Sequence, residues 1–500
     1  MKKQKKKGPI RKVLIANRGE IALRIIRGCH EKGIKTVAVY SDADRWANYV
    51  SQAQESHFIG EAPASESYLR IDKLLKIAKK TGADAIHPGY GFLAENSDFS
   101  EACEKAGIKF IGPPPEVIRK IGNKINARTL AEKNGIPVVP GISQPVQEED
   151  VAQFAKTFGY PVLLKAAGGG GGRGMRVVRK KSELGRAFRE AATEGETSFG
   201  NPDLFVEKYV ENPRHIEIQI LADQKGNLIH LGERECSIQR RHQKLVEESP
   251  SMALDNRLRK KMGEAALRIA RAVQYENAGT CEFLVEGRNY YFLEVNTRLQ
   301  VEHPVTEMVT GIDLVQEQLS IAEGEKLRLR QTDVESRGHA IEARICAEDP
   351  FENFAPSIGQ VAAVQFPSGP FVRVDSDLRR KSEVSVFYDS LLAKVIAWGN
   401  TREEALDRME QALREFKIVG IQTTIPFQLQ LLQNRKFREG KIHTRFVEKE
   451  IHLEKVKTGH DLEAVLLATA LEHQRREKIR PTYTGSSPLP LWIQEFRKSE

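Results

Sequence analysis

The sequence is 500 residues long, has a net charge of +9 and contains five cysteines. Five hundred residues are too many for one hydrophobic core, so we expect about three domains. Seven of the 77 basic residues lie in the first twelve positions, which leaves 70 basic against 68 acidic residues in the rest. This nearly neutral body argues against a nucleic-acid-binding protein, and we expect residues 1–12 to form a basic, disordered tail.

The apolar segments and the cysteines predict a cytoplasmic protein. The start lacks the apolar core of a secretory signal, and the longest apolar stretch, around residues 464–471, is far too short to span a membrane. The cysteines are scattered and include no Cys-x-x-Cys pair. We therefore expect a reduced compartment and no structural zinc.

Short β-branched strands alternate with helical patterns between residue 13 and about residue 115. The expected strands cover residues 13–17, 35–40 and 83–87, and the expected helices cover residues 20–32 and 68–80. This order predicts a parallel sheet with helices on both faces. The turn Asn17-Arg-Gly-Glu20 lacks the full Gly-x-Gly-x-x-Gly fingerprint, so it is weak evidence for dinucleotide binding.

The middle of the chain mixes helices with strands. A helix-rich stretch from about residue 123 to residue 202 surrounds one expected strand, residues 160–165. A strand at residues 203–210, a hairpin at residues 215–231 and a long helix at residues 256–275 follow. This section predicts an α+β domain of about 200 residues.

Five consecutive glycines, Gly168 to Gly172, follow the strand that ends in Lys165. Because ordering glycine costs more backbone entropy than ordering any other residue, such a run is expected where the backbone must flex or approach a ligand closely. Successive N–H groups can bind phosphate oxygens, and a mobile lid can close over them. No Gly-Lys-Ser or Gly-Lys-Thr follows, so this is not a Walker A loop, and the alternative is a flexible linker.

Two apolar runs on either side of Gly287 predict a β-hairpin. A three-residue loop, residues 287–289, would place Glu282 directly opposite Glu294. Facing carboxylates are destabilising unless a positive charge lies between them, so the pair predicts a divalent-cation site.

Beyond Glu294 the polar residues continue at every second position, as Asn296, Arg298, Gln300 and Glu302. These side chains would share one face if the chain stays extended. An amide and a guanidinium in line with two facing acids favour a catalytic row beside the cation. The alternative is an amphipathic hairpin with a solvated outer face.

Other cations and histidines are ambiguous when each is taken alone. Lys124 and Lys165 are candidates for binding phosphate, although each is individually typical of an ordinary surface lysine. The stretch Gln239-Arg-Arg-His-Gln-Lys244 is typical of an anion site or, taken alone, more often of a solvated charge run. His215 and His242 lack zinc-site spacing, and Cys236 is typical of a buried thiol.

A third, strand-rich section extends from about residue 338 to residue 447, with Pro356, Pro367, Gly369 and Pro370 in its turns. The last fifty residues contain a candidate helix, residues 461–478, followed by a stretch rich in Pro, Ser and Gly. We expect this end to be an appendage of the third section.

Six phrases in this order make the chain from about Arg11 to Val447 resemble the biotin carboxylases, which are ATP-grasp enzymes. The phrases are Ile-Ala-Asn-Arg-Gly-Glu-Ile-Ala at 15–22, His-Pro-Gly-Tyr-Gly-Phe-Leu at 87–93, Lys-Ala-Ala-Gly-Gly-Gly-Gly-Gly-Arg-Gly-Met at 165–175, Gln-Arg-Arg-His-Gln-Lys at 239–244, Glu-Val-Asn-Thr-Arg-Leu-Gln-Val-Glu-His-Pro-Val-Thr-Glu at 294–307 and Tyr-Asp-Ser at 388–390. Several independent motifs in one order are far more specific than any single motif.

The resemblance implies a multidomain fold of α/β and α+β type. It implies an N-terminal α/β domain, a central ATP-grasp domain with a glycine-rich lid and a C-terminal mixed domain. We expect these domains at residues 13–122, 123–330 and 331–450, between the basic tail at 1–12 and a helical appendage at 451–500.

The resemblance also assigns roles to particular residues. ATP would be bound by Lys124, Lys165, Gly171, Gly172, His215 and His242, with Glu207, Lys208, Tyr209 and Val210 lining the adenine pocket. Two Mg²⁺ ions, which Mn²⁺ could replace, would be held by Glu282, Glu294 and Asn296. Bicarbonate would be bound by Lys244, Arg298, Gln300, Val301 and Glu302, where Glu302 is the base, and Arg344 would stabilise the biotin enolate.

No Ala-Met-Lys-Met biotinylation motif occurs in the sequence, so we expect biotin to arrive on a separate carrier protein. The expected partners are that carrier, a carboxyltransferase and a second copy of this chain. The C-terminal helix, with Leu462, Leu466, Thr469 and Ala470 near one face, either docks a carrier or carboxyltransferase or packs on the third domain of this chain. The final acceptor would be acetyl-CoA, propionyl-CoA, another acyl-CoA or pyruvate. Two other functions remain open: an ATP-grasp carboxylate–amine ligase, and a non-catalytic nucleotide- or nucleic-acid-binding module.

Overall fold

The computed structural model describes residues 8–142, 144–166, 174–453 and 469. The chain divides into two units, Met1–Leu453 and Glu454–Glu500, and the helices and strands with defined bounds lie in the first unit. Most of the expected basic tail, the run Gly168–Gly172 and the expected helix at 461–478, apart from residue 469, lie outside the described residues. Among the described residues, no helix is both long enough and apolar enough to cross a membrane.

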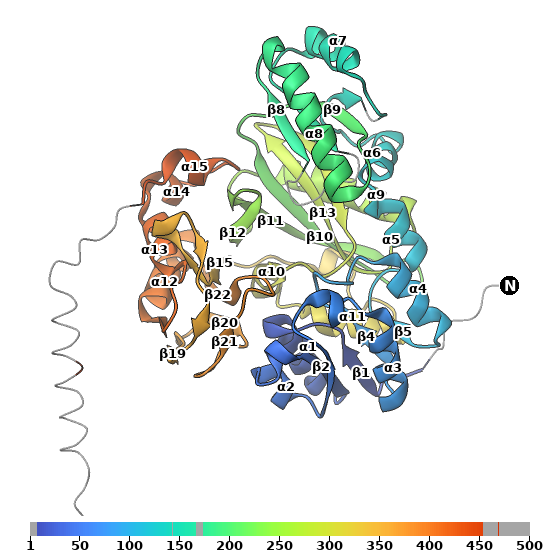
Figure 1. Cartoon of the computed structure of the whole chain (residues 1–500), viewed down its shortest axis with the longest axis vertical. Helices are drawn as coiled ribbons and strands as arrows, with labels where there is room; N and C mark the ends of the chain where they lie inside the picture. Colours follow the sequence, from blue (N-terminus) through green and yellow to red (C-terminus); the bar gives the residue numbers. More distant parts are fainter. Residues whose placement is uncertain (1–7, 143, 167–173, 454–468, 470–500) are drawn as a thin grey trace, which may run out of the picture. The chain divides into compact units, whose positions relative to one another are not determined.

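The N-terminal part is built on a five-stranded parallel sheet, as predicted (Figure 1). In sheet order its strands are β3 (Glu55–Gly60), β2 (Lys35–Ser41), β1 (Lys12–Ile15), β4 (Ala85–His87) and β5 (Lys109–Phe110). Its helices are α1 (Gly19–Glu31), α2 (Asn48–Gln52), α3 (Ile71–Thr81), α4 (Ser97–Lys105) and α5 (Pro115–Gly122).

Side chains of β1 alternate between two hydrophobic cores. Val13 and Ile15 pack with α1, whereas Leu14 packs in the other core with residues of α3 and α4. Helices therefore cover both faces of the sheet. This explains the continuous apolar run in β1, because a strand that is buried on both sides exposes neither face to water. The sequence prediction of helices on both faces is confirmed.

An eight-stranded antiparallel sheet forms the centre of the unit (Figure 1). Its strands, in sheet order, are β14 (Asn289–Asn296), β13 (Asn277–Glu286), β10 (Arg214–Ala222), β11 (Leu228–Arg240), β12 (Gln243–Ser249), β15 (His339–Cys346), β22 (Leu391–Gly399) and β20 (Val372–Ser376). The sheet is continuous across residue 330, where we predicted a domain boundary. The boundaries of the domains stay predictions.

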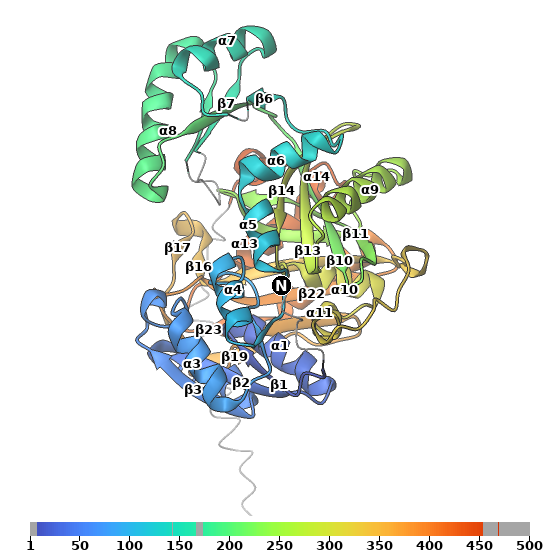
Figure 2. The ribbon, with the colours of Figure 1, turned by 90° about the vertical axis from the view of Figure 1, so that its right-hand side faces the viewer.

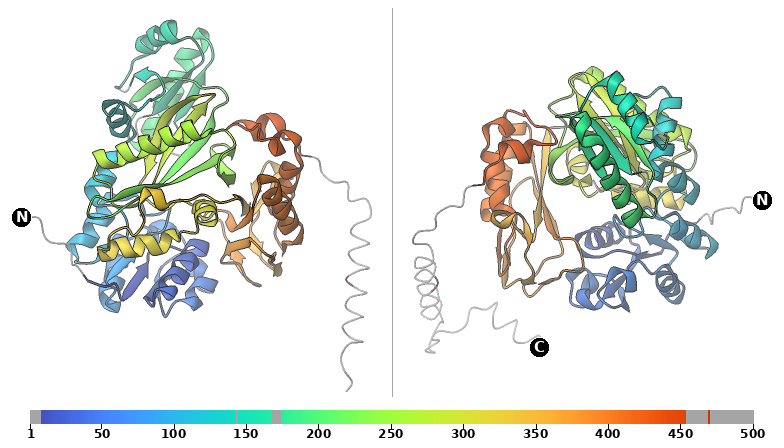
Figure 3. Two further views of the ribbon diagram at one scale, coloured as in Figure 1. Left: turned by 180° about the vertical axis from the view of Figure 1, so that it is seen from behind. Right: turned by 45° about the horizontal axis from the view of Figure 1, so that its top comes forward.

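Helices pack on both ends of this sheet. On β10 and β11 lies α9 (Asn256–Ala272), as Figure 3 shows from behind, and its residues Met262, Ala265 and Ile269 are buried. On the far end, α12 (Arg402–Glu415) packs against β15 and β22, and α13 (Ile425–Gln433) packs against α12 in the same hydrophobic core. Further helices are α6 (Lys124–Lys133), α10 (His303–Thr310), α11 (Leu314–Glu323), α14 (Arg435–Arg438) and α15 (Phe446–Glu450).

A separate four-stranded sheet, with strand order β6-β9-β7-β8, carries Lys165 (Figure 2). Its elements are β6 (Gly141–Ile142), α7 (Glu148–Phe158), β7 (Val162–Ala166), β8 (Met175–Val178), α8 (Leu184–Phe199) and β9 (Leu204–Lys208). Its own core joins Phe154 of α7 and Ala191 of α8 to Leu164 of β7. The sequence predicted only one strand between residues 123 and 202, because β6 and β8 are too short to show a period.

Three two-stranded sheets complete the C-terminal part. They pair β16 (Glu348–Asp349) with β17 (Ala355–Pro356), β18 (Gly359–Gln360) with β21 (Glu383–Val384), and β19 (Ala363–Gln365) with β23 (Lys417–Val419). All six strands are short, as expected in a section punctuated by proline and glycine.

The hairpin β13–β14 places Glu282 directly opposite Glu294, as predicted. The expected three-residue loop is wrong, because Asn289 already pairs with Glu286 and only residues 287 and 288 form the turn. The ladder shifts between Glu282 and Phe283, where Phe283 faces Phe292 and leaves one extra residue on β14. This bulge supplies the residue that the shorter loop lacks, so both arrangements bring the same acids together.

Candidate active site

A cleft of about 1200 Å³ opens between the four-stranded sheet, the large sheet and the N-terminal part. It is lined by every described residue to which the sequence assigned a role in the site. Gly171 and Gly172 lie outside the described residues. Residues more than 200 positions apart, such as Lys124 and Arg344, therefore line one cavity.

One end of the cleft combines apolar walls with lysines. Leu163, Val177, Phe205 and Leu284 line it, which suits a flat aromatic base. Lys165 forms an ion pair with Glu207, whose other oxygen accepts from Arg128 at 2.7 Å. Lys208, Tyr209 and Val210 follow Glu207 along the wall of the cleft.

Lys124 and His242 approach the same end from two other elements. Lys124 begins α6, and its Nζ lies 2.9 Å from Glu294 Oε2. His242 lies in the tight turn between β11 and β12, with a φ of 65°. A positive φ is uncommon for a residue other than glycine. Here the tight turn places His242 in the lining of the cleft.

The carboxylate of Glu282 is contacted by several side chains from different strands and loops. Its Oε1 accepts from Asn296 at 2.9 Å and from Gln300 at 3.1 Å, and it lies 3.1 Å from Lys244 Nζ. Burial opposes its ionisation, but Lys244 and His215 hold the pKa of Glu282 below its usual value. Glu282 therefore stays an anion although its side chain is buried.

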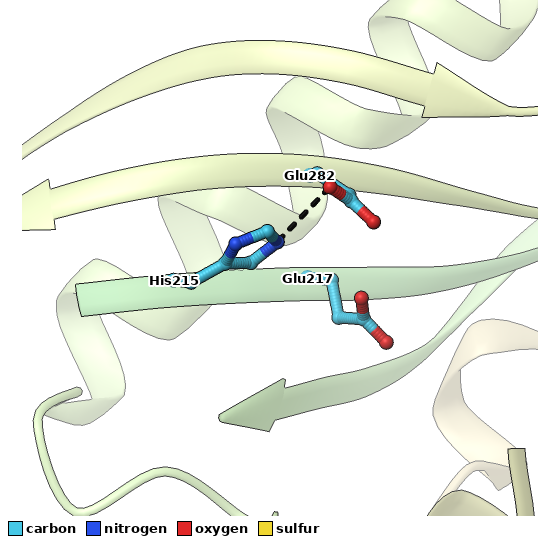
Figure 4. A group of neighbouring side chains, drawn as sticks. All are labelled: His215, Glu217 and Glu282. Atoms are coloured by element: carbon cyan, nitrogen blue, oxygen red, sulfur yellow. Dashed lines mark ion pairs between the residues drawn. The ribbon is translucent and has the colours of Figure 1, made fainter. Parts of the chain in front are cut away.

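His215, Glu217 and Glu282 come together from neighbouring strands, as Figure 4 shows. His215 and Glu217 project from the same face of β10, and His215 Nε2 lies 3.0 Å from Glu282 Oε2. The three residues offer ligand atoms within 4.8 Å of one another. However, Glu217 is fully buried and already paired with Arg234 and Lys244, so we assign it to charge balance rather than to metal binding.

The donor set around the hairpin fits a hard divalent cation. Glu282 and Glu294 face each other across two strands, and Asn296 Oδ1 adds a neutral oxygen on β14. Carboxylate and amide oxygens are the ligands that Mg²⁺ and Mn²⁺ prefer. Glu294 pairs with Lys124, and its side chain is 29% exposed, so it is accessible to an ion from the cleft.

Lys244 connects three carboxylates in the middle of the cleft. Its Nζ lies 2.6 Å from Glu217, 3.1 Å from Glu282 and 2.5 Å from Glu302. Burial alone would lower the pKa of Lys244, but these three carboxylates raise it well above its usual value. The ammonium is therefore permanently charged.

Glu302 is fully buried at the N-terminus of α10 and lies between two cations. Its Oε1 contacts Lys244, and its Oε2 accepts from Arg344 at 2.8 Å. Burial opposes ionisation, yet Lys244, Arg344 and Arg234 lower the pKa of Glu302 well below its usual value. An ionised carboxylate held in this way can accept a proton from a bound substrate.

Arg344 and Arg298 complete the charged row. Arg344 lies on β15 and donates to Glu247 at 2.7 Å as well as to Glu302. Arg298 donates to Asn296 at 3.0 Å, to Gln300 at 2.9 Å and to Glu95 at 2.9 Å. The chain leaves the strand after Asn296, so the expected extended row is wrong in conformation, although hydrogen bonds still bring its members together.

Several polar and charged residues at or beside the site were missed in the sequence. They are Tyr90, Glu95, Glu217, Arg234, Glu247 and Lys394. A usable signal exists for Glu217, because His215, Glu217 and Gln219 occupy alternate positions of β10 and are buried. Lys394 gave no signal, since it is one lysine in an apolar strand, yet its Nζ donates to the carbonyl of Val301 at 2.8 Å.

Three family models match the chain in the order that the fold shows. They are "Biotin carboxylase, N-terminal domain" at residues 9–118, "Carbamoyl-phosphate synthase L chain, ATP binding domain" at residues 123–330 and "Biotin carboxylase C-terminal domain" at residues 342–449. With the cleft described above, these matches define an ATP-dependent ligase of three domains. The chain belongs to the biotin carboxylase family.

Relatives and solved structures agree with this family. The chain is 53% identical to a pyruvate carboxylase subunit of Methanothermobacter thermautotrophicus over 87% of this chain and 89% of that protein. It is also 53% identical to biotin carboxylase 1 of Bacillus subtilis over 88% and 98%.

Two solved structures share the fold closely. One is the biotin carboxylase domain dimer of Hydrogenobacter thermophilus 2-oxoglutarate carboxylase in complex with MgADP, ADP and bicarbonate, with a TM-score of 0.86 and 47% identity over 89% of this chain and 100% of that one. The other is a biotin carboxylase–βγ-ATP complex from Campylobacter jejuni, with a TM-score of 0.86 and 46% identity over 88% and 99%.

Proposed function

We propose that this chain uses ATP and bicarbonate to carboxylate biotin, giving carboxybiotin, ADP and phosphate. The observation that carries the proposal is the position of Glu302, an ionised and fully buried acid held between Lys244 and Arg344. This acid lies in the same cleft as the facing acids Glu282 and Glu294. Related domains with this fold hold MgADP and bicarbonate, which supports the same ligands here.

The nucleotide fits the end of the cleft that combines lysines with apolar walls. Lys124, Lys165, His215, His242, Gly171 and Gly172 would bind its phosphates or ribose, and residues 207–210 would line the base. Glu282, Glu294 and Asn296 would hold Mg²⁺. When bound, Mg²⁺ would neutralise charge on the transferred phosphoryl group, which is the main requirement of phosphoryl transfer.

Bicarbonate fits the centre of the cleft. Lys244 and Arg298 would bind the anion, with Gln300 and the backbone of Val301 fixing its orientation. Glu302 would take the bicarbonate proton on a carboxylate oxygen while the bicarbonate oxygen attacks the γ-phosphate of ATP. The products of this step are ADP and carboxyphosphate.

Biotin fits beside Arg344. Carboxyphosphate would break down to carbon dioxide and phosphate, and that phosphate would take the ureido N–H proton of biotin. The resulting enolate oxygen would lie against the guanidinium of Arg344, and the enolate nitrogen would attack carbon dioxide. A fixed positive charge is worth most where negative charge develops in a site that excludes water.

We further propose that biotin arrives on a carrier protein and leaves for a carboxyltransferase. A relative named as a carboxylase subunit supports this division of labour, and a solved relative that is a domain dimer supports a homodimer. Relatives include enzymes named for pyruvate and for 2-oxoglutarate. We therefore assign the choice of acceptor, whether acyl-CoA or a 2-oxo acid, to the carboxyltransferase.

The test is ATP cleavage by the purified chain with Mg²⁺, measured with and without bicarbonate and with and without free biotin. Carboxybiotin is followed directly with labelled bicarbonate. We expect cleavage that requires bicarbonate and rises with biotin, together with labelled carboxybiotin. Cleavage that needs an amine instead, with no label in biotin, would contradict the proposal.

A further inference from the structure

Across β12, β15 and β22, one face of the large sheet carries a row of charged side chains, whereas the opposite face is mostly apolar. By register, Glu247 of β12, Glu342 and Arg344 of β15, and Lys394 of β22 share the charged face. The intervening residues, such as Ala343 and Val395, lie in a hydrophobic core. The site described above uses Arg344 on this face and leaves Glu342 without a role.

Glu342 is fully buried, and neither of its carboxyl oxygens has a hydrogen-bond partner among the described residues. The same is true of Glu247 Oε2, although Glu247 Oε1 accepts from Arg344. A buried carboxylate without a partner is strongly disfavoured, so these three oxygens require an explanation.

The register supplies a partner for each acid. Glu247 and Glu342 lie directly opposite each other on adjacent antiparallel strands. Side chains at such positions start from β-carbons that are about 4.5–5.5 Å apart, so the two carboxyl groups are within reach of each other. Two buried carboxylates at this spacing cannot both ionise, and one proton between them satisfies both.

The other charged groups around Glu342 are already engaged. Lys394 donates to Val301 and lies 3.1 Å from Glu20, and Arg344 contacts Glu247 and Glu302. Glu302 adds negative charge from the start of α10, and Tyr90 from the N-terminal part donates to Glu20. No cation is therefore left in hydrogen-bond contact with Glu342 among the described residues.

We propose that Glu247 and Glu342 share one proton, and that this proton makes Arg344 available to the biotin enolate. The two acids are positioning residues, because they act through Arg344 and not on substrate. The second half of the inference rests on the proposed role of Arg344, whereas the shared proton does not.

The electrostatics support this arrangement. Burial raises the pKa of Glu342 well above its usual value, and Lys394 only partly opposes this. Burial also raises the pKa of Glu247, to about 7, although Arg344 lowers it. The pair therefore holds its proton at neutral pH and releases it to solvent as the pH rises.

The consequence concerns the charge that faces Arg344. With the proton present, Glu247 carries less than a full negative charge, so the guanidinium keeps attraction for a developing oxyanion. Without it, Glu247 and Glu302 together neutralise Arg344 before biotin binds. The proton thus favours stabilisation of the transition state over an internal ion pair.

The first experiment detects the proton itself by infrared spectroscopy of the nucleotide-free, full-length chain. A protonated carboxyl group has a C=O stretch distinct from that of a carboxylate, and labelling glutamate with ¹³C shifts it. We expect such a band in the wild type, a loss of its intensity as the pH rises, and a lower intensity in Glu342→Gln, where an amide replaces one of the two acids. A wild type without the band, or a Glu342→Gln variant with the full wild-type intensity at neutral pH, would overturn the shared proton.

The second experiment follows the pH dependence of kcat/KM for free biotin. The amide of Glu342→Gln donates to Glu247 as the protonated acid does but cannot lose that hydrogen. We expect wild-type kcat/KM to fall with rising pH and the variant to resist this fall, so that the two differ by about tenfold for each pH unit above the transition. Glu342→Ala, which cannot donate, should be impaired at every pH.

The infrared band and the pH profile test the shared proton and its effect on Arg344 separately. Parallel pH profiles of the wild type and Glu342→Gln, with the infrared band intact, would disprove the action on Arg344 while retaining the shared proton. Loss of biotin-dependent turnover in the wild type would count against the proposed function itself, and the infrared result would still decide the pair. Binding of ATP by each variant checks that the cleft is folded.

Discussion

The two ends of the cleft differ in how many carboxylates contact each cation. At the nucleotide end, Lys124 and Lys165 each pair with one carboxylate, and their side chains are 37% and 15% exposed. At the other end, Lys244 contacts three carboxylates and Arg344 two, with side-chain exposures of 12% and 15%.

The difference follows from what each end must bind. A nucleotide brings several negative charges, so its binding site needs cations that are free to exchange partners. Bicarbonate and a biotin enolate carry one charge each, and their site must be assembled beforehand in a dry environment. We call Lys244, Glu302 and Arg344 the central cluster. The contrast predicts that substitutions in the central cluster affect the chemical steps, whereas substitutions at the nucleotide end affect the binding of ATP.

The largest effect is expected for Glu302→Gln. The amide keeps the size of the side chain but cannot accept the bicarbonate proton, so bicarbonate-dependent ATP cleavage should fall about 10²- to 10⁴-fold. Glu335→Gln, an exposed glutamate paired with Arg337 outside the cleft, is the matched control and should retain activity. A Glu302→Gln enzyme with near-normal bicarbonate-dependent turnover would exclude Glu302 as the base.

The next largest effect is expected for Arg344→Ala. Removing the guanidinium should lower kcat/KM for biotin about 10²- to 10³-fold, because an oxyanion donor is lost. Binding of ATP, measured by calorimetry, should change little, since Lys124 and Lys165 are untouched. Equal losses of nucleotide affinity and biotin turnover would mean that the two ends of the cleft are not separable.

Two neighbouring glutamates provide a comparison within one strand. Glu247 and Glu248 project to opposite faces of β12, and Glu248 pairs with Arg402 at 2.6 Å and His339 at 2.7 Å. Burial raises the pKa of Glu247 to about 7, whereas Arg402 and His339 outweigh burial and lower that of Glu248 to about 2. The same strand thus holds one acid that favours its proton and one that favours its charge.

The contributions of the two acids to the free energy of unfolding should depend on pH with opposite signs. Because the pKa of Glu248 is lowered on folding, its contribution is present above the unfolded value near 4.5 and is lost as the pH falls toward 2. Glu248→Gln should therefore lower the free energy of unfolding by about 3 kcal/mol at pH 7, since Arg402 stays buried without its partner, and by less below pH 3.

For Glu247 the raised pKa means that stability is present below 4.5 and is lost as the pH rises through about 7. Urea unfolding at several pH values measures both effects. If Glu248→Gln destabilised the chain equally at pH 3 and pH 7, the ionised pair with Arg402 would not be the cause.

Much of the arrangement could be predicted from the sequence. The alternation of strands and helices before residue 115 predicted the parallel sheet, and the apolar runs around Gly287 predicted the hairpin. The loop of that hairpin was predicted incorrectly, because a bulge and a shorter turn produce the same pairing as a longer turn. The local sequence therefore predicted which two acids face each other, but not the loop length that brings them together.

The central charge cluster could not be predicted by periodicity. Lys244 and Arg344 were identified by resemblance, and Glu217, Glu247 and Lys394 were missed. Each lies in a strand that has a neighbour across the sheet from a distant segment, as β12 has β15. Which strands become neighbours is a property of the tertiary fold. The partner of a buried charge can therefore be distant in the sequence, where periodicity does not reveal it.

The smallest effect separates metal binding from base chemistry at the hairpin. Glu294→Gln keeps the β13–β14 register but removes one of two facing carboxylates, so Mg²⁺ should bind more weakly. Loss of an outer partner already lowers metal affinity roughly 10- to 100-fold, so the Mg²⁺ concentration needed for half-maximal ATP cleavage should rise at least about tenfold. Activity at saturating Mg²⁺ should largely recover.

Glu286→Gln is the matched control, because Glu286 lies on the same hairpin, is exposed and lies outside the cleft lining. Its Mg²⁺ dependence should equal that of the wild type. If Glu294→Gln lost activity that no Mg²⁺ concentration restored, Glu294 would act in the chemical step. The nucleotide end would then share the preassembled character of the central cluster.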